Sequence, residues 1–207
     1  VCGDFFNYYR LPQGRLAGVL ADVTGHAMDA AIPLVQFSGI LESQIQLGGS
    51  LEELVGQLNR LLCRTLPDHT FVCFTMGELD LASRTLRVSN NACPYPYHFR
   101  ATTGEVVELQ LSSYPLGIRP DLDCQVLEVQ LEPGDRLVFC SDGIAEAGNA
   151  DGEIFGFERT LESVRQGCVD DLSAPALLER IIAEVKAFTG DTPQGDDQTI
   201  VVMRTEG

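Results

Sequence analysis

Aspartates stand at the ends of four apolar segments in this sequence. The positions are Asp4, Asp22, Asp142 and the adjacent pair Asp196-Asp197. Taken singly, each has an ordinary explanation, as a charge at a strand edge, a helix start or a turn residue. If the strands lie side by side, however, their ends can converge at one rim of a sheet. The carboxylates would then repel one another unless protons or cations neutralise them.

The residue types around these aspartates indicate which cations to expect. Oxygen ligands without a His or Cys cluster are typical of Mg²⁺ or Mn²⁺. Two such ions can share one water molecule, lower its pKa and hold it in line with a phosphorus atom. The pattern therefore indicates metal-dependent hydrolysis of a phosphate ester.

Other routes to phosphate hydrolysis lack their motifs. No Cys precedes Arg at the Cys-x₅-Arg spacing of a thiolate nucleophile, since Cys93 reaches Phe99 and Arg100 lies one step further. Asp121-Leu122-Asp123 imitates an aspartyl nucleophile, but it does not follow a buried strand. A Gly-x-Ser-x-Gly elbow and a Gly-x₄-Gly-Lys phosphate loop are both absent.

The stretch 136–147 indicates how one of the aspartates is positioned. Residues 137–140 form an unbroken apolar run behind the turn signal at 132–135, which predicts a strand buried on both faces. The chain then runs directly into Asp142-Gly143, and a carboxylate beside a glycine suits close approach to a ligand. The alternative is that Asp142-Gly143 is only a turn that closes the strand.

Short strands and amphipathic helices fill most of the remaining chain. Apolar patterning predicts further strands over residues 1–9, 15–23, 71–79, 85–90, 97–100, 106–109, 127–131 and 199–203. Helical periodicity predicts a helix from residue 27 to a Gly48-Gly49 break, a second over 51–62 behind a capping box at Ser50, and a third over 176–188. No repeat or linker divides the chain, so we expect one α/β domain with antiparallel hairpins and helices covering the sheet faces.

Charge and composition exclude several functional classes. The net charge of −16 argues against nucleic acid as a partner, because phosphates would be repelled. No apolar run approaches the roughly 18 residues that a membrane span needs, so we expect no membrane insertion. The seven cysteines are scattered without a Cys-x-x-Cys pair, which predicts buried thiols in a reducing, cytoplasmic compartment. Because the chain starts abruptly on Val1, we expect it to be the C-terminal part of a longer protein.

Four motifs in order resemble a known family. They are Gly3-Asp4-Phe5-Phe6, Asp22-Val23-Thr24-Gly25-His26, Ser141-Asp142-Gly143-Ile144-Ala145-Glu146-Ala147 and Asp196-Asp197-Gln198-Thr199. Together they span essentially the whole chain and resemble the PPM-type metal-dependent serine/threonine phosphatases, most closely their bacterial SpoIIE-like branch. The resemblance implies an α+β fold, an α-β-β-α sandwich of two mainly antiparallel sheets flanked by helices. It also implies a site for two Mn²⁺ or Mg²⁺ ions at one end of the paired sheets.

The resemblance further implies roles for residues of the first two motifs. Asp22 would bridge the two metal ions, and the backbone carbonyl of Val23 would coordinate one of them. Asp4 would bind one metal directly or through water. A catalytic role for His26 stays open beside a structural hydrogen bond at the helix start, because it lies four residues past Asp22.

The last two motifs would complete the site. Asp142 and Asp196 would bind the metals, with Asp197 as the alternative to Asp196. Asp22 and Asp142 are thus the expected catalytic residues, and a hydroxide bridging the metals would attack phosphoserine or phosphothreonine directly, without a phosphoenzyme.

Three departures from the family pattern accompany the resemblance. Cys2 replaces a usual Gly, Asn7 stands where Asp is frequent, and the usual Asn-Ala-Gly-His-Pro stretch reads Asn91-Ala92-Cys93-Pro94-Tyr95. None of these departures removes an expected metal ligand.

The resemblance also indicates what the domain works with. The whole chain, residues 1–207, would be a single phosphatase domain behind an upstream sensor or receiver domain, and a homodimer is a further expectation. Its substrate would be a phosphorylated regulatory protein of the anti-anti-sigma type. The alternative function is a pseudophosphatase that holds a regulator without chemistry, although mutually repelling carboxylates have no use in a pure scaffold.

Overall fold

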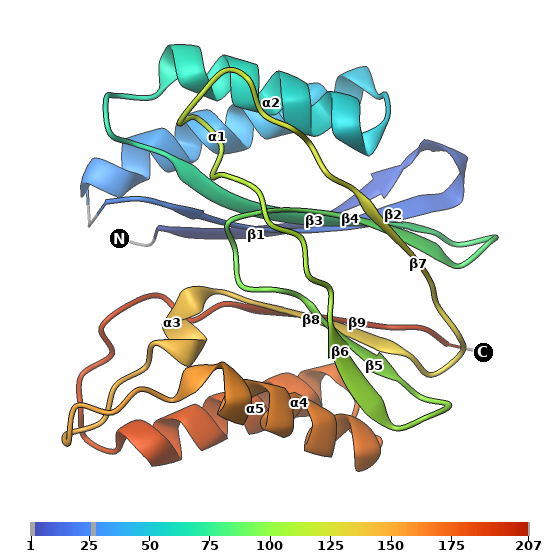
Figure 1. Ribbon diagram of the computed structural model, residues 1–207, viewed down its shortest axis with the longest axis vertical. Helices are drawn as coiled ribbons and strands as arrows, with labels where there is room; N and C mark the ends of the chain where they lie inside the picture. Colours follow the sequence, from blue (N-terminus) through green and yellow to red (C-terminus); the bar gives the residue numbers. More distant parts are fainter. Residues whose placement is uncertain (1–2, 26–27, 207) are drawn as a thin grey trace. The chain divides into compact units, whose positions relative to one another are not determined.

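The computed structural model describes residues 3–25 and 28–206, and the chain divides into two compact units. The first unit comprises Val1–Cys93 and Leu111–Gln130, and the second comprises Pro94–Gln110 and Leu131–Gly207. Each unit consists of one antiparallel sheet with helices packed on one face (Figure 1).

The first unit contains a five-stranded sheet in the order β1-β2-β3-β4-β7. Its strands are β1 (Asp4–Leu11), β2 (Arg15–Val23), β3 (Val72–Asp80), β4 (Thr85–Asn91) and β7 (Leu127–Gln130). A single 3₁₀ turn, η1 (Pro12–Gly14), joins β1 to β2, with positive φ at its last two residues. The two hairpins predicted from the sequence for this sheet, β1–β2 and β3–β4, are confirmed.

Two helices, α1 (Met28–Leu47) and α2 (Leu51–Thr65), cover one face of this sheet (Figure 1). Phe37 of α1 lies between Phe5 and Phe74, with edge-on ring contacts at centroid distances of 5.6 and 5.9 Å. Burial of these rings and their aliphatic neighbours fixes the helix layer on the sheet.

The predicted capping box begins α2. Ser50 Oγ accepts a hydrogen bond from the Glu53 backbone N–H at 3.2 Å, and the Ser50 N–H donates to the Glu53 carboxylate at 2.9 Å. The backbone N–H groups of Ser50 and Glu53, which have no partner within the helix, are thereby both satisfied. The break after α1 is therefore encoded locally.

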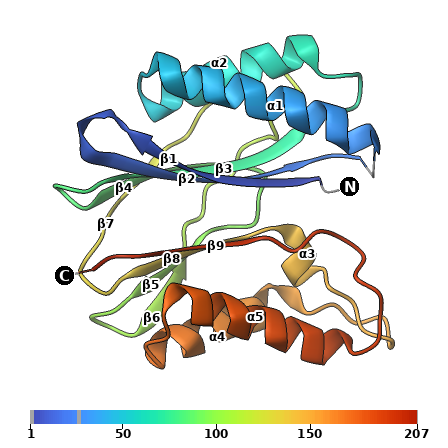
Figure 2. The ribbon, with the colours of Figure 1, turned by 180° about the vertical axis from the view of Figure 1, so that it is seen from behind.

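The second unit contains a four-stranded sheet in the order β6-β5-β8-β9. Its strands are β5 (Tyr97–Arg100), β6 (Glu105–Glu108), β8 (Arg136–Cys140) and β9 (Ile200–Arg204). Helices α4 (Gly156–Val169) and α5 (Ala174–Thr189) cover one face, and a one-turn helix, α3 (Asp142–Ala145), follows β8 (Figure 2). Every residue of β8 is buried, as the apolar run predicts.

Helix α4 is the longer of two helices that the sequence pattern did not predict, the other being the one-turn α3. The buried face of α4 carries few large apolar side chains, because it packs closely against α5. A methyl group on Gly167 would stand 2.5 Å from Leu177 Cδ1. The buried residues of α4 are Thr160, Ser163, Val164, Gly167 and Cys168. Such a face of small and polar residues has no clear apolar stripe.

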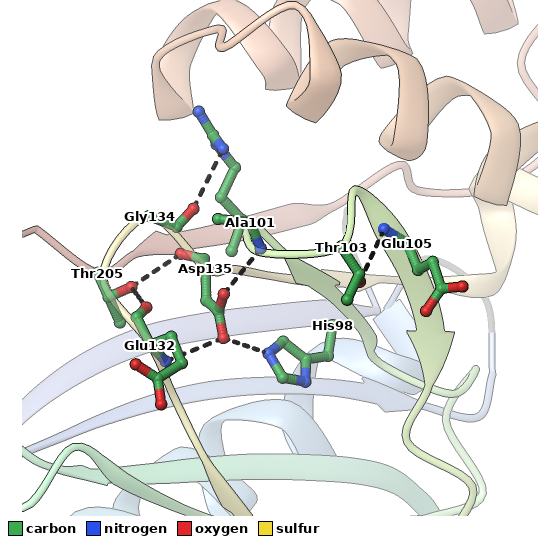
Figure 3. A network of polar contacts seen from close by, with 9 residues as sticks. His98, Ala101, Thr103, Glu105, Glu132, Gly134, Asp135 and Thr205 are labelled. Atoms are coloured by element: carbon green, nitrogen blue, oxygen red, sulfur yellow. Dashed lines mark hydrogen bonds and ion pairs between the residues drawn. The ribbon is translucent and has the colours of Figure 1, made fainter.

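A buried polar network fixes the start of β8 (Figure 3). The Asp135 carboxylate accepts hydrogen bonds from His98 Nε2 at 2.8 Å, the Ala101 N–H at 2.9 Å and the Glu132 N–H at 3.0 Å. Both side chains of the His98–Asp135 pair are at most 3% exposed. His98, to which the sequence assigned no role, thus ties β5 to the turn before β8, at the strand end opposite Asp142.

Two predictions from composition can be compared with the described residues. No helix within residues 3–25 and 28–206 combines the length and the apolar character that crossing a membrane requires. None of the six cysteines of the described chain forms a disulfide: Cys63, Cys73, Cys93, Cys124, Cys140 and Cys168. The expectation of thiols rather than a disulfide framework is confirmed for these six.

Candidate metal site

The first unit brings two of the predicted aspartates together. Asp4 of β1 lies directly opposite Asp22 of β2 in the antiparallel ladder. Residues opposite one another in such a ladder point to the same face with their Cβ atoms about 5 Å apart, and like charges there are destabilising. The buried neighbours Ala21 and Val23 face the helix layer, so the alternation of β2 turns Asp22 to the other face of the sheet.

Thr24 fixes the chain immediately after this pair. Its Oγ1 donates to the carbonyl of Phe71 at 3.1 Å and accepts from the Phe71 N–H at 3.0 Å. The Thr24 N–H also donates to the Phe71 carbonyl at 3.1 Å. The end of β2, with Asp22 and Val23, is therefore held against the start of β3. Sequence reasoning missed this positioning role, because a Thr at a strand end has no distinctive pattern.

The second unit brings the other two aspartates together. Asp142 follows β8, Asp196 precedes β9, and these two strands are neighbours in the sheet. Ser141 joins the end of β8 to the segment before β9. Its Oγ donates to the Asp197 carbonyl at 3.2 Å and accepts from the Thr199 N–H at 2.9 Å. The Ser141 N–H donates to the Thr199 carbonyl at 2.9 Å. Backbone and side-chain bonds thus hold both carboxylates at one end of this sheet.

Gly143 makes this close approach feasible. A Cβ atom at position 143 would stand 2.0 Å from the Asp197 carbonyl oxygen and 3.4 Å from Asp196 Cβ. Gln198 Nε2 also donates to the Gly143 carbonyl at 3.3 Å. The glycine predicted to serve close approach to a ligand serves close approach to the backbone of the chain itself. The residues after β8 form α3, so Asp142-Gly143 is more than a closing turn.

The electrostatics of this pair are unfavourable for two carboxylates by themselves. Burial raises the pKa of the Asp142 carboxyl, and the negative charge of Asp196 raises it further, while backbone hydrogen bonds oppose both effects. Asp197 stays the alternative to Asp196 as a candidate ligand. The Asp197 N–H donates to Asp196 Oδ1 at 2.8 Å, which orients that carboxylate.

The donor set fits hard divalent cations. Both pairs consist of carboxylate oxygens, the ligands that Mg²⁺ and Mn²⁺ prefer. A cation would relieve the repulsion within each pair and favour the ionised form of Asp142. In the described ranges of the chain no three His, Cys, Asp or Glu side chains lie close enough together to hold an ion. Each unit therefore contributes a pair of candidate ligands.

The condition stated for convergence at one rim of a single sheet is not met. Asp4 and Asp22 belong to the five-stranded sheet, and the other two aspartates flank strands of the four-stranded sheet. Alternation within a strand cannot reveal which sheet the strand joins. His26 lies outside the described residues, so a catalytic role and a structural hydrogen bond at the helix start both stay open for it.

Comparisons with known proteins agree with this architecture. The profile of the family described as stage II sporulation protein E (SpoIIE) matches residues 12–206. Stage II sporulation protein E of Bacillus subtilis is 23% identical over 210 residues, covering 100% of this chain and 24% of that protein. Phosphoserine phosphatase RsbP of Bacillus subtilis is 24% identical over 148 residues, covering 70% of this chain and 36% of that protein.

A solved structure supports the fold. The SiaA-PP2C domain of Pseudomonas aeruginosa superposes with a TM-score of 0.86 at 24% identity, covering 100% of this chain and 82% of that chain. The predicted fold class, two mainly antiparallel sheets flanked by helices, is confirmed. The chain spans only about a quarter to a third of the length of these two curated relatives.

Proposed function

The chain belongs to the SpoIIE family, and from that premise we propose that it is a metal-dependent phosphatase domain. It hydrolyses phosphoserine or phosphothreonine on a regulatory protein, of the anti-anti-sigma type. The match to a relative named a phosphoserine phosphatase supports this reaction class.

The arrangement around Asp142 is the main observation that supports the proposal. Asp142 is a half-buried carboxyl placed beside a second carboxylate, and three hydrogen bonds of Ser141 together with the glycine at 143 fix that arrangement. A raised pKa costs stability at neutral pH unless something compensates for it. A bound divalent cation supplies that compensation, which links the arrangement to function.

The four aspartates share the work of holding the cations. Asp22 and Asp142 are the central ligands, with the carbonyl of Val23, Asp4 and Asp196 as further ligands, and Asp197 orients Asp196. When bound, Mg²⁺ or Mn²⁺ supplies Lewis acidity toward water and toward the phosphoryl oxygens. In this proposal the four carboxylates bind the cations, and none of them is assigned the role of a covalent nucleophile.

The domain is proposed to act inside a longer signalling protein, with its two units working as one phosphatase domain. In the curated relatives the matching segment is a minor part of the chain, which supports an attached sensor or receiver domain. The strongly acidic surface supports protein rather than nucleic acid as the substrate.

Hydrolysis of an aryl phosphate and of a phosphoserine peptide, with Mn²⁺ and with chelator, tests the reaction. We expect turnover only with the metal, and a loss of at least about 100-fold in Asp142→Asn, because a ligand carboxylate is removed. Asp151→Asn, which changes an exposed aspartate of the same unit, is the matched control and should retain wild-type rates. Turnover that persists in chelator would contradict the proposal. Tight binding of a phosphoprotein without turnover in Mn²⁺ would favour the pseudophosphatase.

Calorimetric Mn²⁺ titration tests whether both pairs hold the same ions. Asp22→Asn and Asp142→Asn are each expected to weaken binding, and the double variant should lose less than the product of the two single losses. Strictly multiplicative losses would indicate two independent sites and would contradict shared ligation. Asp68→Asn, an exposed position in the first unit, serves as the control for Asp22.

A further inference from the structure

The second unit contains a pocket of about 740 Å³ directly beside Asp196. Three segments of this unit contribute its lining: the C-terminal half of α5, the segment 190–198 and the segment from Gly143 to Asn149. Its volume lies in the range of ligand-binding pockets, which is far more than a metal ion needs.

Lys186 is the distinctive residue of this pocket. It is the only lysine in the sequence and the only cationic side chain among the lining residues. Within the described residues it forms no ion pair, although acidic side chains outnumber basic ones by 30 to 14. Arg180, two turns earlier on the same helix, pairs with both Asp170 and Glu184. Because Lys186 is the only cationic side chain of the pocket lining, an anionic group that enters the pocket would be favoured beside it.

Helical spacing explains how Lys186 reaches the pocket. Ile182, Val185, Lys186 and Thr189 recur at intervals of three and four residues, so they share one face of α5. Val185 is buried and anchors this face to the core of the unit, while Lys186 is exposed. The pocket therefore has an apolar floor and a charged rim, both set by one helix.

Two side-chain amides, those of Gln194 and Gln198, also line the pocket. Gln194 Nε2 donates to the Asp196 carbonyl at 2.7 Å, and Gln198 Nε2 donates to the Gly143 carbonyl at 3.3 Å. Each amide is thereby oriented, and its oxygen keeps the capacity to accept a hydrogen bond. Oriented amide oxygens beside an apolar floor suit the N–H groups of an extended peptide.

Two carboxylates also line the pocket, and they limit where an anion can lie. Asp196 is a proposed metal ligand, so a bound cation offsets its charge. Glu146 is unpaired within the described chain, as many acids must be at a net charge of −16. The position favoured for an acidic group is therefore at the Lys186 rim, on α5.

We propose that this pocket binds the segment of the substrate protein that flanks the phosphorylated residue, with a substrate Asp or Glu paired to Lys186. This inference rests on the proposed phosphatase function and adds a specificity determinant to it. Lys186 then selects among phosphoproteins by their charge beside the phosphoserine. An ordinary structural role for Lys186, near the C-terminal end of α5 where cations are favoured, predicts no such selectivity.

Two short phosphoserine peptides, one with Glu residues flanking the phosphoserine and one with Gln at the same positions, test the proposal. We expect wild type to show a higher kcat/KM for the Glu peptide, and Lys186→Met to reduce the Glu-to-Gln ratio by about three-fold. Lys186→Glu should reduce the ratio by about ten-fold, because attraction becomes repulsion. Added salt should reduce the ratio in wild type but not in Lys186→Met.

Arg100→Glu is the matched control for charge reversal. Arg100 is exposed, belongs to the same unit and forms no ion pair with the described residues. It follows Phe99, which pairs with the first residue of β8, so it lies at the sheet end opposite Asp142. Its charge reversal should leave the Glu-to-Gln ratio as in wild type. A ratio that changes equally in Arg100→Glu and Lys186→Glu would overturn the proposal, since net charge would then explain the effect.

A binding measurement separates this proposal from the phosphatase function. Fluorescence anisotropy of the two labelled phosphopeptides in metal-free buffer should show the same dependence of the Glu-to-Gln affinity ratio on Lys186 without any turnover, while the uncompensated charge of Asp196 lowers both affinities. If wild type binds the Glu peptide preferentially through Lys186 yet hydrolyses nothing in Mn²⁺, the pocket stands and the phosphatase function fails. If hydrolysis proceeds but neither kcat/KM nor binding distinguishes the peptides in a Lys186-dependent way, the pocket proposal is wrong and the function stands.

Discussion

Gly143→Ala is expected to disable the candidate metal site without touching a carboxylate. The new methyl group would stand 2.0 Å from the Asp197 carbonyl oxygen and 3.0 Å from its carbonyl carbon. The obstacle is backbone rather than the end of a flexible side chain, so the contact cannot be relieved by a rotamer change. Either α3 or the segment before β9 must move.

The size of the movement follows from the contact distance. A separation of at least about 3 Å is needed between a methyl carbon and a carbonyl oxygen, so the segments must part by about 1 Å. That displacement strains the Ser141–Asp197 and Gln198–Gly143 hydrogen bonds, now 3.2 and 3.3 Å. Overpacking of this kind costs about 1–3 kcal/mol, against a gain below about 1 kcal/mol from replacing Gly by Ala in a helix.

The functional loss is expected to exceed the loss of stability. A misplacement of about 1 Å between groups that must act together reduces rates by about 100-fold, and disturbed support of metal ligands weakens affinity by about 10- to 100-fold. Calorimetric Mn²⁺ titration, thermal unfolding and aryl phosphate hydrolysis measure these effects. Gly195→Ala is the matched control, because it lies next to Asp196, has no positive φ and has nothing within 4 Å of the added Cβ.

Wild-type Mn²⁺ affinity together with an unchanged unfolding temperature in Gly143→Ala would refute the reasoning. It would show that the segments around Asp142 and Asp196 part without consequence. Equal losses in Gly195→Ala would refute it as well, since the control introduces the same methyl group without the clash.

Three further outcomes are expected. Asp135→Ala removes the acceptor of three buried or half-buried hydrogen bonds and should lower the unfolding free energy in urea by about 3 kcal/mol, while Mn²⁺ affinity stays unchanged because the network lies at the other end of β8. Burial and the charge of Asp196 raise the pKa of the Asp142 carboxyl. In the metal-free protein its contribution to folding stability is therefore complete below the unfolded-state pKa and is lost as pH rises through the folded-state pKa. Metal-free Asp142→Asn should melt above wild type at neutral pH and show no difference below about pH 4. Burial raises the pKa of the Cys168 thiol to about 11, so iodoacetamide at pH 8 should modify it only in denaturant, as read by peptide mass spectrometry.

Features with a local cause could be predicted from the sequence. The capping box at Ser50 is a contact between residues three apart, and the buried strand before Asp142 is a continuous apolar run. The alternation of β2 likewise turns Asp22 away from the helix layer. Each of these follows from backbone periodicity and neighbouring side chains, which a linear sequence contains in full.

Features that depend on close packing could not be predicted. Helix α4 has no clear apolar stripe. Its close contact with α5 depends on the small size of Gly167, where a side chain would clash with Leu177, rather than on large apolar residues. The Asp135–His98 pair joins residues 37 apart in the sequence, and no local pattern around either residue predicts that they pair.

The candidate site shows the same division. The sequence by itself determined which aspartates end strands, and the order of the motifs around them identified the family. Only the tertiary structure decided that they form two pairs on two sheets, that the charge of Asp196 acts on Asp142, and that Lys186 lines a pocket beside Asp196. The physical reason is that strand pairing and helix packing join distant segments, and the free energy of those contacts is not encoded in any local period.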